Sequence, residues 1–281
     1  MKILVTGYNG QLGYDVIKEL NRRSIECKGV DREDFDITNR DQTVEYICSY
    51  APDAIVHCAA YTAVDRAEDD KEICRKVNVD GTENIAVACE ALNAKMLYVS
   101  TDYVYGGAGD IPFEPGDPTN PKNVYGRTKL DGENAVKRHT DKYFIVRTSW
   151  VFGINGNNFV KTMLQLGKEK DELNVVCDQI GSPTYTPDLA KLICDLVVTE
   201  KYGTYHGTNE NYCSWADFAA EIMKLGNRQT KINPVLSSEY PVKAERPHNS
   251  RLSKKCLDSA GIARLPSWQD ALERYIKELG E

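Results

Sequence analysis

The stretch KILVTGYNGQLG, residues 2–13, decides the fold. It joins a β-rich apolar run to an amphipathic stretch over 11–22 that is typical of a helix. The turn between them holds three glycines, Gly7, Gly10 and Gly13. In such a turn the first glycine permits the tight bend, the second lets the backbone approach an anion, and the third lets the helix pack closely on the strand. We therefore predict a dinucleotide site in which the N-terminus of the helix faces a pyrophosphate.

The first half of the chain repeats this strand-and-helix alternation. The β-rich runs lie at 2–7, 27–31, 53–60, 94–101 and 143–150. Helical patterns separate them at 11–22, 40–50, 76–92 and 124–138. Near-continuous apolar strands separated by helices are typical of βαβ units. The pattern predicts an α/β fold with a doubly wound parallel sheet that is buried on both faces.

The pattern loosens after residue 150. We expect helices over 157–168, 187–199, 214–225 and 267–279, a strand over 173–178, and a Pro-, Asn- and Ser-rich connection over 233–250. No flexible linker marks a boundary. The sequence predicts a dinucleotide-binding domain over 1–150 and a smaller lobe over 151–281. Within that second part, about 171–200 is expected to return to the first sheet.

Composition limits the classes of function. The chain has 281 residues, 41% of them hydrophobic and 27% charged, as expected of a globular protein. The net charge of -7 argues against a nucleic-acid surface. Nine cysteines without paired spacing favour reduced thiols over disulfides or a metal site. No apolar run reaches membrane-spanning length and no signal-peptide pattern is present, so we expect a cytoplasmic protein without a membrane partner.

Charged residues follow the second predicted strand. Asp31 ends that strand, where a carboxylate can accept hydrogen bonds from the adenosine ribose of a dinucleotide. Arg32 follows and could instead contact a 2′-phosphate, so the pair leaves NAD and NADP both open. A solvated loop is the alternative for these two charges. Asp36 and Ile37 are placed to flank the adenine.

Polar side chains also follow the later strands. Thr101 and Asp102 end the run at 94–101, and Tyr125 and Lys129 lie four residues apart at the start of the next helix. Carbonyl reduction needs a proton donor beside the hydride source. A tyrosine, whose pKa is ordinarily about 10, serves when nearby positive charge lowers that value. Thr101 supplies a second hydroxyl to the carbonyl oxygen.

The same spacing occurs a second time, at Tyr14 and Lys18. These two residues belong to the helix that follows the glycine turn, at the pyrophosphate end of the predicted cofactor. We therefore interpret Tyr14 as a packing residue and Lys18 as a solvated charge, and we place the chemistry at Tyr125.

Taken together, the glycine turn, STD at 100–102 and Tyr-x-x-x-Lys resemble the extended short-chain dehydrogenases/reductases. Further motifs resemble the dTDP-4-dehydrorhamnose reductase family within them, in the expected order over nearly the whole chain: VHCAAYTAVDRAE, STDYVYGG, NVYGRTKLDGE, RTSWVFG, GNNFVKTML, DQIGSPTYT and RPHNSRL. The resemblance implies a Rossmann domain with a small C-terminal sugar-nucleotide lobe. It also implies NADPH- or NADH-dependent reduction at C4 of dTDP-4-dehydro-L-rhamnose.

The resemblance also implies particular residues. Tyr125 would be the proton donor, Lys129 its partner and Thr101 the hydroxyl helper. The residues implied in cofactor contact, besides Tyr125 and Lys129, are Gly10, Gln11, Leu12, Asp31, Asp36, Ile37, Ala60 and Tyr61. Those implied in substrate contact, besides Thr101, are Asp102, Trp150, Arg246 and Asn249. Some family members have a metal-linked dimer interface of glutamates. This chain has Asp15 and Pro187 there, so we expect no metal, and a monomer or a homodimer.

Four other functions stay open at this point. A sugar-nucleotide 4,6-dehydratase would be expected to have a glutamate after STD, where this chain has Tyr103. A related 4-ketoreductase or 4-epimerase would share most of the site, although an epimerase would hold NAD tightly. A non-catalytic regulatory subunit resembling the methionine adenosyltransferase beta chain is disfavoured by intact Thr101, Tyr125 and Lys129.

Overall fold

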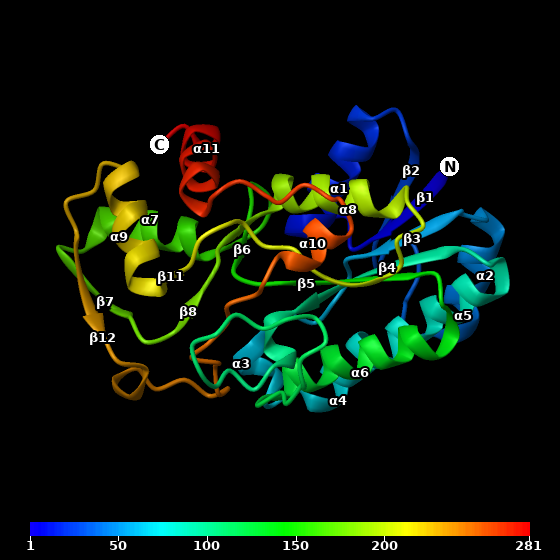
Figure 1. The fold of residues 1–281 in the computed structure, drawn as a ribbon, viewed down its shortest axis with the longest axis horizontal. Coiled ribbons are helices and arrows are strands. Elements are labelled where there is room, and N and C mark those ends of the chain that lie inside the picture. The colour runs from blue at the N-terminus through cyan, green and yellow to red at the C-terminus, as the bar shows by residue number, and fades with distance from the viewer.

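A six-stranded parallel sheet forms the centre of the molecule, in a computed structural model that describes residues 1–281 (Figure 1). Each hydrogen-bonded pair of neighbouring strands is parallel. In spatial order the strands are β10 (Gly203–His206), β5 (Tyr143–Thr148), β4 (Lys95–Thr101), β3 (Ala54–His57), β1 (Lys2–Thr6) and β2 (Glu26–Val30). This order confirms the predicted α/β class with a doubly wound parallel sheet.

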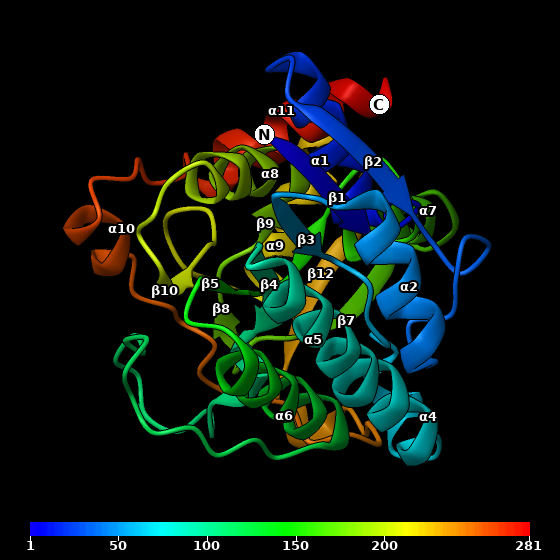
Figure 2. The same cartoon turned by 90° about the vertical axis from the view of Figure 1, so that its right-hand side faces the viewer.

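Helices cover both faces of this sheet (Figure 2). Successive strand residues point to opposite faces, so Ile3 and Val5 pack into one core and Leu4 packs into the other. Helices α1 (Gln11–Arg22) and α8 (Thr186–Val197) bury the first core. The second core is covered by α2 (Arg40–Tyr50), α5 (Thr82–Leu92) and α6 (Val124–His139). Burial on both faces explains why these strands read as continuous apolar runs.

Shorter elements connect strands β3 and β4 to their helices. After β3 come α3 (Val64–Ala67), α4 (Lys71–Arg75) and a π-helical segment, Lys76–Gly81, that runs directly into α5. A single 3-10 turn, Asp102–Val104, follows β4. The helical pattern predicted over 76–92 is confirmed, although its first turn and a half is wider than an α-helix.

A smaller lobe with its own hydrophobic core lies beside the sheet (Figure 1). Its core holds 18 buried residues, all between Phe152 and Ile276. The helices of this part are α7 (Phe159–Glu169), α9 (Trp215–Leu225) and α11 (Trp268–Leu279), with a 3-10 turn at Ser237–Glu239. Helix α10 (Lys255–Ser259) instead buries Leu257 in the first core of the large lobe. Its strands are β6 (Val151–Phe152), β7 (Glu172–Val176), β8 (Ile180–Gly181), β9 (Thr184–Tyr185), β11 (Cys213–Ser214) and β12 (Lys231–Val235). No helix is both long and apolar enough to cross a membrane.

One expected strand pairing was wrong. The strand expected over 173–178 forms as β7, but it pairs with β12 in the small lobe and not with the central sheet. The sixth strand of the sheet is β10, whose four residues pair with β5. Within 171–200, only α8 returns to the large lobe, where it packs on α1. The apolar pattern of a strand does not identify the strand that it pairs with, and β10 is too short to show a clear alternation.

Candidate active site

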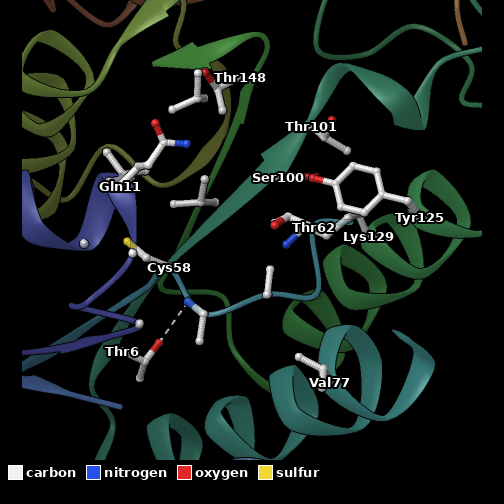
Figure 3. A pocket seen from close by; sticks show the side chains of 18 of the residues that line it. Thr6, Gln11, Cys58, Thr62, Val77, Ser100, Thr101, Tyr125, Lys129 and Thr148 are labelled. Atoms are coloured by element: carbon white, nitrogen blue, oxygen red, sulfur yellow. Dashed lines mark hydrogen bonds between the residues drawn. The ribbon is translucent and has the colours of Figure 1, made fainter. Parts of the chain in front are cut away.

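A cavity of about 1050 Å³ opens over the carboxyl ends of the parallel strands (Figure 3). Its lining comes from the segments that follow β1, β2, β3, β4 and β5, from the first turns of α6, and from Trp215 of the small lobe. In an open α/β sheet, ligands bind at this edge, where the strand ends converge. The cavity is therefore the place to look for the predicted chemistry.

The glycine turn is required by the packing at one end of the cavity. Gly7 has a φ of +69°, and a Cβ there would lie 2.7 Å from the amide nitrogen of Ala59. A Cβ on Gly13 would lie 2.2 Å from the carbonyl oxygen of Gly7. Gly10 precedes α1 without any side chain capping the helix, so its first backbone N–H groups face the cavity. This cradle fits an anion such as a pyrophosphate.

The predicted adenosine end lies beside the end of β2. Asp31 lines the cavity, and its carboxylate accepts hydrogen bonds from the backbone N–H groups of Arg32 at 2.9 Å and Asn9 at 3.3 Å. Arg32 also lines the cavity, is exposed and forms no ion pair. Asp36 and Ile37 complete this part of the lining. A carboxylate and a free guanidinium therefore stand side by side where a ribose would lie.

Close backbone packing brings α6 next to the end of β4. Asn123 caps the helix by accepting a hydrogen bond from the N–H of Gly126 at 2.8 Å. A Cβ on Gly126 would lie 2.2 Å from the carbonyl oxygen of Tyr103, so only glycine allows this approach. As a result, Tyr125 on the first turn of α6 faces the region of Thr101 at the end of β4 (Figure 3).

Burial dominates the electrostatics of the tyrosine and the lysine. It raises the pKa of Tyr125 well above its usual value, and the neighbouring Thr101 hydroxyl counteracts this by hydrogen bonding. Burial also lowers the pKa of Lys129 to about 7, against the opposing charge of Glu133. The ammonium lies over the ring of Tyr98, 4.0 Å from its centroid. In this structure the interaction that lowers the pKa of Tyr125 is therefore the one with Thr101. The sequence had led us to expect that Lys129 would lower it.

Two buried polar atoms in the cavity have no hydrogen-bond partner within the protein. Thr101 donates to Oδ1 of Asp102 at 2.9 Å, whereas Oδ2 of Asp102 is unpaired. Burial raises the pKa of Asp102 to about 6. The second atom is the hydroxyl oxygen of Thr148, which is the register partner of Thr101 on β5. Buried polar groups are normally satisfied, so both atoms are candidates to contact a ligand. Thr148 was missed, although it too is a hydroxyl at a strand end.

A buried network supports the site from behind. Ser100 lines the cavity and donates to Glu133 at 2.6 Å. The same carboxylate pairs with Arg147 through two hydrogen bonds of 2.9 and 2.6 Å. Arg147 in turn donates to the hydroxyl of Tyr105 at 2.5 Å, and that hydroxyl pairs with His206 of β10 at 2.8 Å. The network ties the ends of β4, β5 and β10 to α6.

Trp150 lies between β5 and β6 in a strained backbone conformation. Its φ of +49° is in the left-handed region, which costs a bulky residue on the order of 1–3 kcal/mol. Its indole stacks on that of Trp215, with ring centroids 3.7 Å apart and an interplanar angle of 15°. Both residues line the cavity. The sequence predicted Trp150 as a site residue and missed Trp215, because Trp215 belongs to the smaller lobe and no local pattern connects it to β5.

The structure brings most of the predicted residues together but places three elsewhere. Ala60, Gln11 and Leu12 line the cavity with those described above; Tyr61, Arg246 and Asn249 do not. The hydroxyl of Tyr61 donates to Asp70 at 2.8 Å. Arg246 forms an ion pair of 2.6 Å with Asp65 of α3. Asn249 is buried and donates to the carbonyl oxygen of Ile111 at 2.9 Å.

Side-chain contacts tie α1 to residues from the second half of the chain beside the glycine turn. Asn158 donates to Gln11 at 3.1 Å, and Thr186 donates to Asp15 at 2.5 Å. Asp15 is buried in that contact, which leaves its carboxylate facing the chain's own α8. No group of three or more His, Cys, Asp or Glu side chains is arranged to hold a metal ion.

A glycine turn that opens a doubly wound sheet, with Thr, Tyr and Lys at the adjoining strand ends, defines an extended short-chain dehydrogenase/reductase. Comparison with known proteins narrows this class. The family model of the RmlD substrate binding domain matches residues 1–281. The spore coat polysaccharide biosynthesis protein SpsK of Bacillus subtilis is 39% identical, over 99% of this chain and 97% of that protein.

Solved structures agree with the family match. A dTDP-4-dehydrorhamnose reductase from Clostridium acetobutylicum is 42% identical and superposes with a TM-score of 0.98 over 100% of both chains. One from Bacillus anthracis, solved in complex with NADP, is 43% identical with a TM-score of 0.96, over 99% of this chain and 100% of that one. The chain belongs to the dTDP-4-dehydrorhamnose reductase family of the extended short-chain dehydrogenases/reductases.

Proposed function

We propose that the protein reduces the C4 keto group of dTDP-4-dehydro-L-rhamnose with NADPH or NADH, giving dTDP-L-rhamnose for cell-surface polysaccharide. The observation that carries this proposal is the convergence of Thr101, Tyr125 and Lys129 in the cavity that also contains the glycine turn. The full-length similarity to reductases of this name supports the choice of substrate.

The cavity suits a dinucleotide cofactor, which would supply the hydride. Gly7, Gly10 and Gly13 leave the space that a pyrophosphate needs against the first turn of α1. Asp31 would accept hydrogen bonds from the adenosine ribose, and Arg32 would pair with a 2′-phosphate when one is present. Because both side chains are available, we propose that both cofactor forms bind. Asp36, Ile37 and Ala60 would line the adenine and ribose end, and Lys129 would hold ribose hydroxyls.

The proton side of the reaction is assigned to Tyr125. Reduction adds a hydride to C4 and a proton to the carbonyl oxygen, and the phenol donates that proton. Burial keeps this phenol protonated, as a donor requires. Thr101 lies beside it and steadies the developing oxyanion. Lys129 is buried with a pKa of about 7, so it can take part in restoring the proton to the tyrosine.

The sugar nucleotide is assigned to the side of the cavity that faces the small lobe. Asp102, with one unpaired carboxylate oxygen, would accept a hydrogen bond from a sugar hydroxyl. Trp150 would pack against the sugar. We propose that residues 1–150 mainly hold the cofactor and that 151–281 mainly hold the sugar nucleotide, with α8 returning to the large lobe. Arg246 and Asn249 stay predictions, since their side chains are engaged in contacts outside the cavity.

Other assignments are less well supported. Tyr103 stands where a 4,6-dehydratase would be expected to have a glutamate, and a regulatory subunit would not need Tyr125 in the cavity beside the buried Lys129. We expect a cytoplasmic monomer or homodimer without a nucleic-acid partner, and each of these points stays a prediction.

The proposal is tested by following NADPH and NADH oxidation at 340 nm against a panel of 4-keto sugar nucleotides. Rapid consumption with dTDP-4-dehydro-L-rhamnose, and formation of dTDP-L-rhamnose in equal amount, is the expected result. Consumption with a different 4-keto sugar only would assign a related reductase. Isomerisation of a sugar nucleotide without net cofactor oxidation would indicate an epimerase.

A further inference from the structure

Two stacked indoles form one wall of the cavity. Trp150 lies between β5 and β6, Trp215 begins α9, and both side chains pack against the core of the small lobe. With centroids 3.7 Å apart and planes 15° from parallel, the rings are in full face-to-face contact. The two rings therefore form one continuous apolar surface in the cavity lining.

The small lobe contacts the edge of the Trp150 indole as well as its face. A Cβ on Gly181 of β8 would lie 2.9 Å from Cε2 and 3.0 Å from Cζ2 of the Trp150 indole. Gly181 pairs with Cys213 of β11, and the strand runs directly into Trp215. One small two-stranded sheet thus sets both contacts. The packing of this sheet against the indole offsets the strain of the left-handed backbone conformation at Trp150. Without that packing the backbone would not keep this conformation.

The indole wall adjoins the reacting end of the cavity. Trp150 follows closely after Thr148, which is the register partner of Thr101 on the neighbouring strand. The same cavity is also lined by Asp102, which has one unpaired carboxylate oxygen. The lining therefore offers a sugar both a hydrogen-bonding group and a broad apolar surface. A 6-deoxy sugar has such an apolar edge, at its C6 methyl group.

We propose that Trp215 is a specificity-determining residue that, stacked on Trp150, completes an apolar wall for the C6 methyl edge of a 6-deoxy-4-keto sugar. This inference rests on the proposed function and deepens it. The wall favours the methyl group over a hydroxymethyl group, because a buried hydroxyl would find no partner on the indole faces. A planar nucleobase is the other occupant that stacked indoles could take, and the experiment separates the two.

Binding of three nucleotides provides the test, measured calorimetrically with NADP⁺ present: dTDP, dTDP-L-rhamnose and dTDP-L-mannose. The last two sugars differ only in the hydroxyl on C6. Trp215→Leu should weaken the binding of dTDP-L-rhamnose by roughly 10- to 100-fold and should abolish the preference for dTDP-L-rhamnose over dTDP-L-mannose. The affinity for dTDP should not change. Trp215→Phe retains an aromatic face and should recover most of the affinity.

Trp268→Phe is the matched control. Trp268 is an indole of the same lobe, it is buried, and it does not line the cavity. Its indole N–H has no hydrogen-bond partner, so its replacement by phenylalanine leaves no group unpaired. The near-ultraviolet circular dichroism of the stacked indoles should disappear in Trp215→Leu and persist in Trp268→Phe. Gly181→Ala displaces the edge of Trp150 and should reproduce the loss of sugar selectivity with Trp215 intact.

Two results would overturn the inference. Equal weakening of dTDP and dTDP-L-rhamnose in Trp215→Leu would assign the wall to the nucleobase. Unchanged affinities together with a lowered melting temperature would make the pair a structural contact only. Turnover of wild-type protein is measured first, so a failure of the proposed function appears there as absent NAD(P)H oxidation. A failure of this inference alone appears in a wild type that is active.

Discussion

The two Tyr-x-x-x-Lys pairs of this chain have the same spacing and opposite environments. Tyr14 is 43% exposed, so its interpretation as a packing residue was wrong. The side chain of Lys18 is 62% exposed, as expected of a solvated charge, and reaches Glu278 across the surface at 3.9 Å. Lys129 is only 2% exposed, and Tyr125 faces the cavity beside Thr101. The difference teaches that helical spacing sets which side chains are neighbours, whereas the strand end next to the helix decides whether they can do chemistry.

The largest expected effect is the difference in kcat between variants of Tyr125 and of Tyr14. Tyr125→Phe removes the proposed proton donor and should lower kcat roughly 10²- to 10⁴-fold, while binding of NADPH is retained. Tyr14→Phe should leave kcat unchanged. Steady-state rates of NADPH oxidation and fluorescence titration of NADPH measure the two quantities. Comparable rates in the two variants would remove the distinction between the pairs.

The second largest expected effect is the difference in stability that the buried Arg147–Glu133 ion pair and the exposed Lys18–Glu278 ion pair contribute. Arg147→Met strands the carboxylate of Glu133, whose side chain is fully buried, and should cost about 3–5 kcal/mol of unfolding free energy. Lys18→Met breaks the exposed pair with Glu278 and should cost about 1 kcal/mol at most. Urea unfolding of both variants tests this. A loss for Arg147→Met as small as that for Lys18→Met would show that the network does not support the site.

The buried lysine should also reveal itself in the pH dependence of stability. The pKa of Lys129 falls from 10.5 to about 7 on folding, so between these values the unfolded chain binds more protons. Stability from this group therefore rises as the pH rises from 7 towards 10.5.

Below pH 10.5, folding must bury an amine that is charged in the unfolded chain, which costs free energy. Lys129→Met removes this cost and should stabilise the cofactor-free protein by a few kcal/mol at pH 7. The difference in unfolding free energy between Lys129→Met and the wild type should shrink as the pH approaches 10. Urea unfolding at pH 7, 8.5 and 10 measures it, and a gap that does not change with pH would mean that Lys129 stays charged. The variant should lose activity throughout, which shows that the buried amine serves function and not stability.

The smallest effect concerns the first helix, whose role is to meet the pyrophosphate. Gly13→Ala would place a methyl group 2.2 Å from the carbonyl oxygen of Gly7 and should weaken NADPH binding by roughly tenfold or more. Gly116→Ala, where a Cβ would meet nothing within 4 Å, is the matched control. Equal affinity in the two variants would argue against a cofactor at the glycine turn.

The sequence revealed features that depend on neighbours along the chain. Five of the six sheet strands and the helices between them follow from apolar runs and periodicity, and the cavity residues Thr101 and Tyr125 follow from strand ends. Thr148 could have been found by the same rule. Contacts between distant segments could not be found in this way: the pairing of β7 with β12, the short edge strand β10 and the stack of Trp215 on Trp150.

Arg246 illustrates the same limit from the other side. A basic residue in a loop signals a possible ligand, but nothing in the local sequence shows that Asp65 of α3 is its partner. The local charge pattern identifies candidates, and only the tertiary arrangement shows which of them face the cavity.

The central claim is hydride transfer to C4 of a sugar nucleotide in the cavity of Tyr125. It is tested most directly with NADPH in which both hydrogens at C4 of the nicotinamide are deuterium and with dTDP-4-dehydro-L-rhamnose, and the product is examined by nuclear magnetic resonance. The account predicts dTDP-L-rhamnose with deuterium at C4 of the sugar, one per NADPH oxidised, and its loss in Tyr125→Phe. A product without deuterium at C4, or the same yield from Tyr125→Phe, would contradict it.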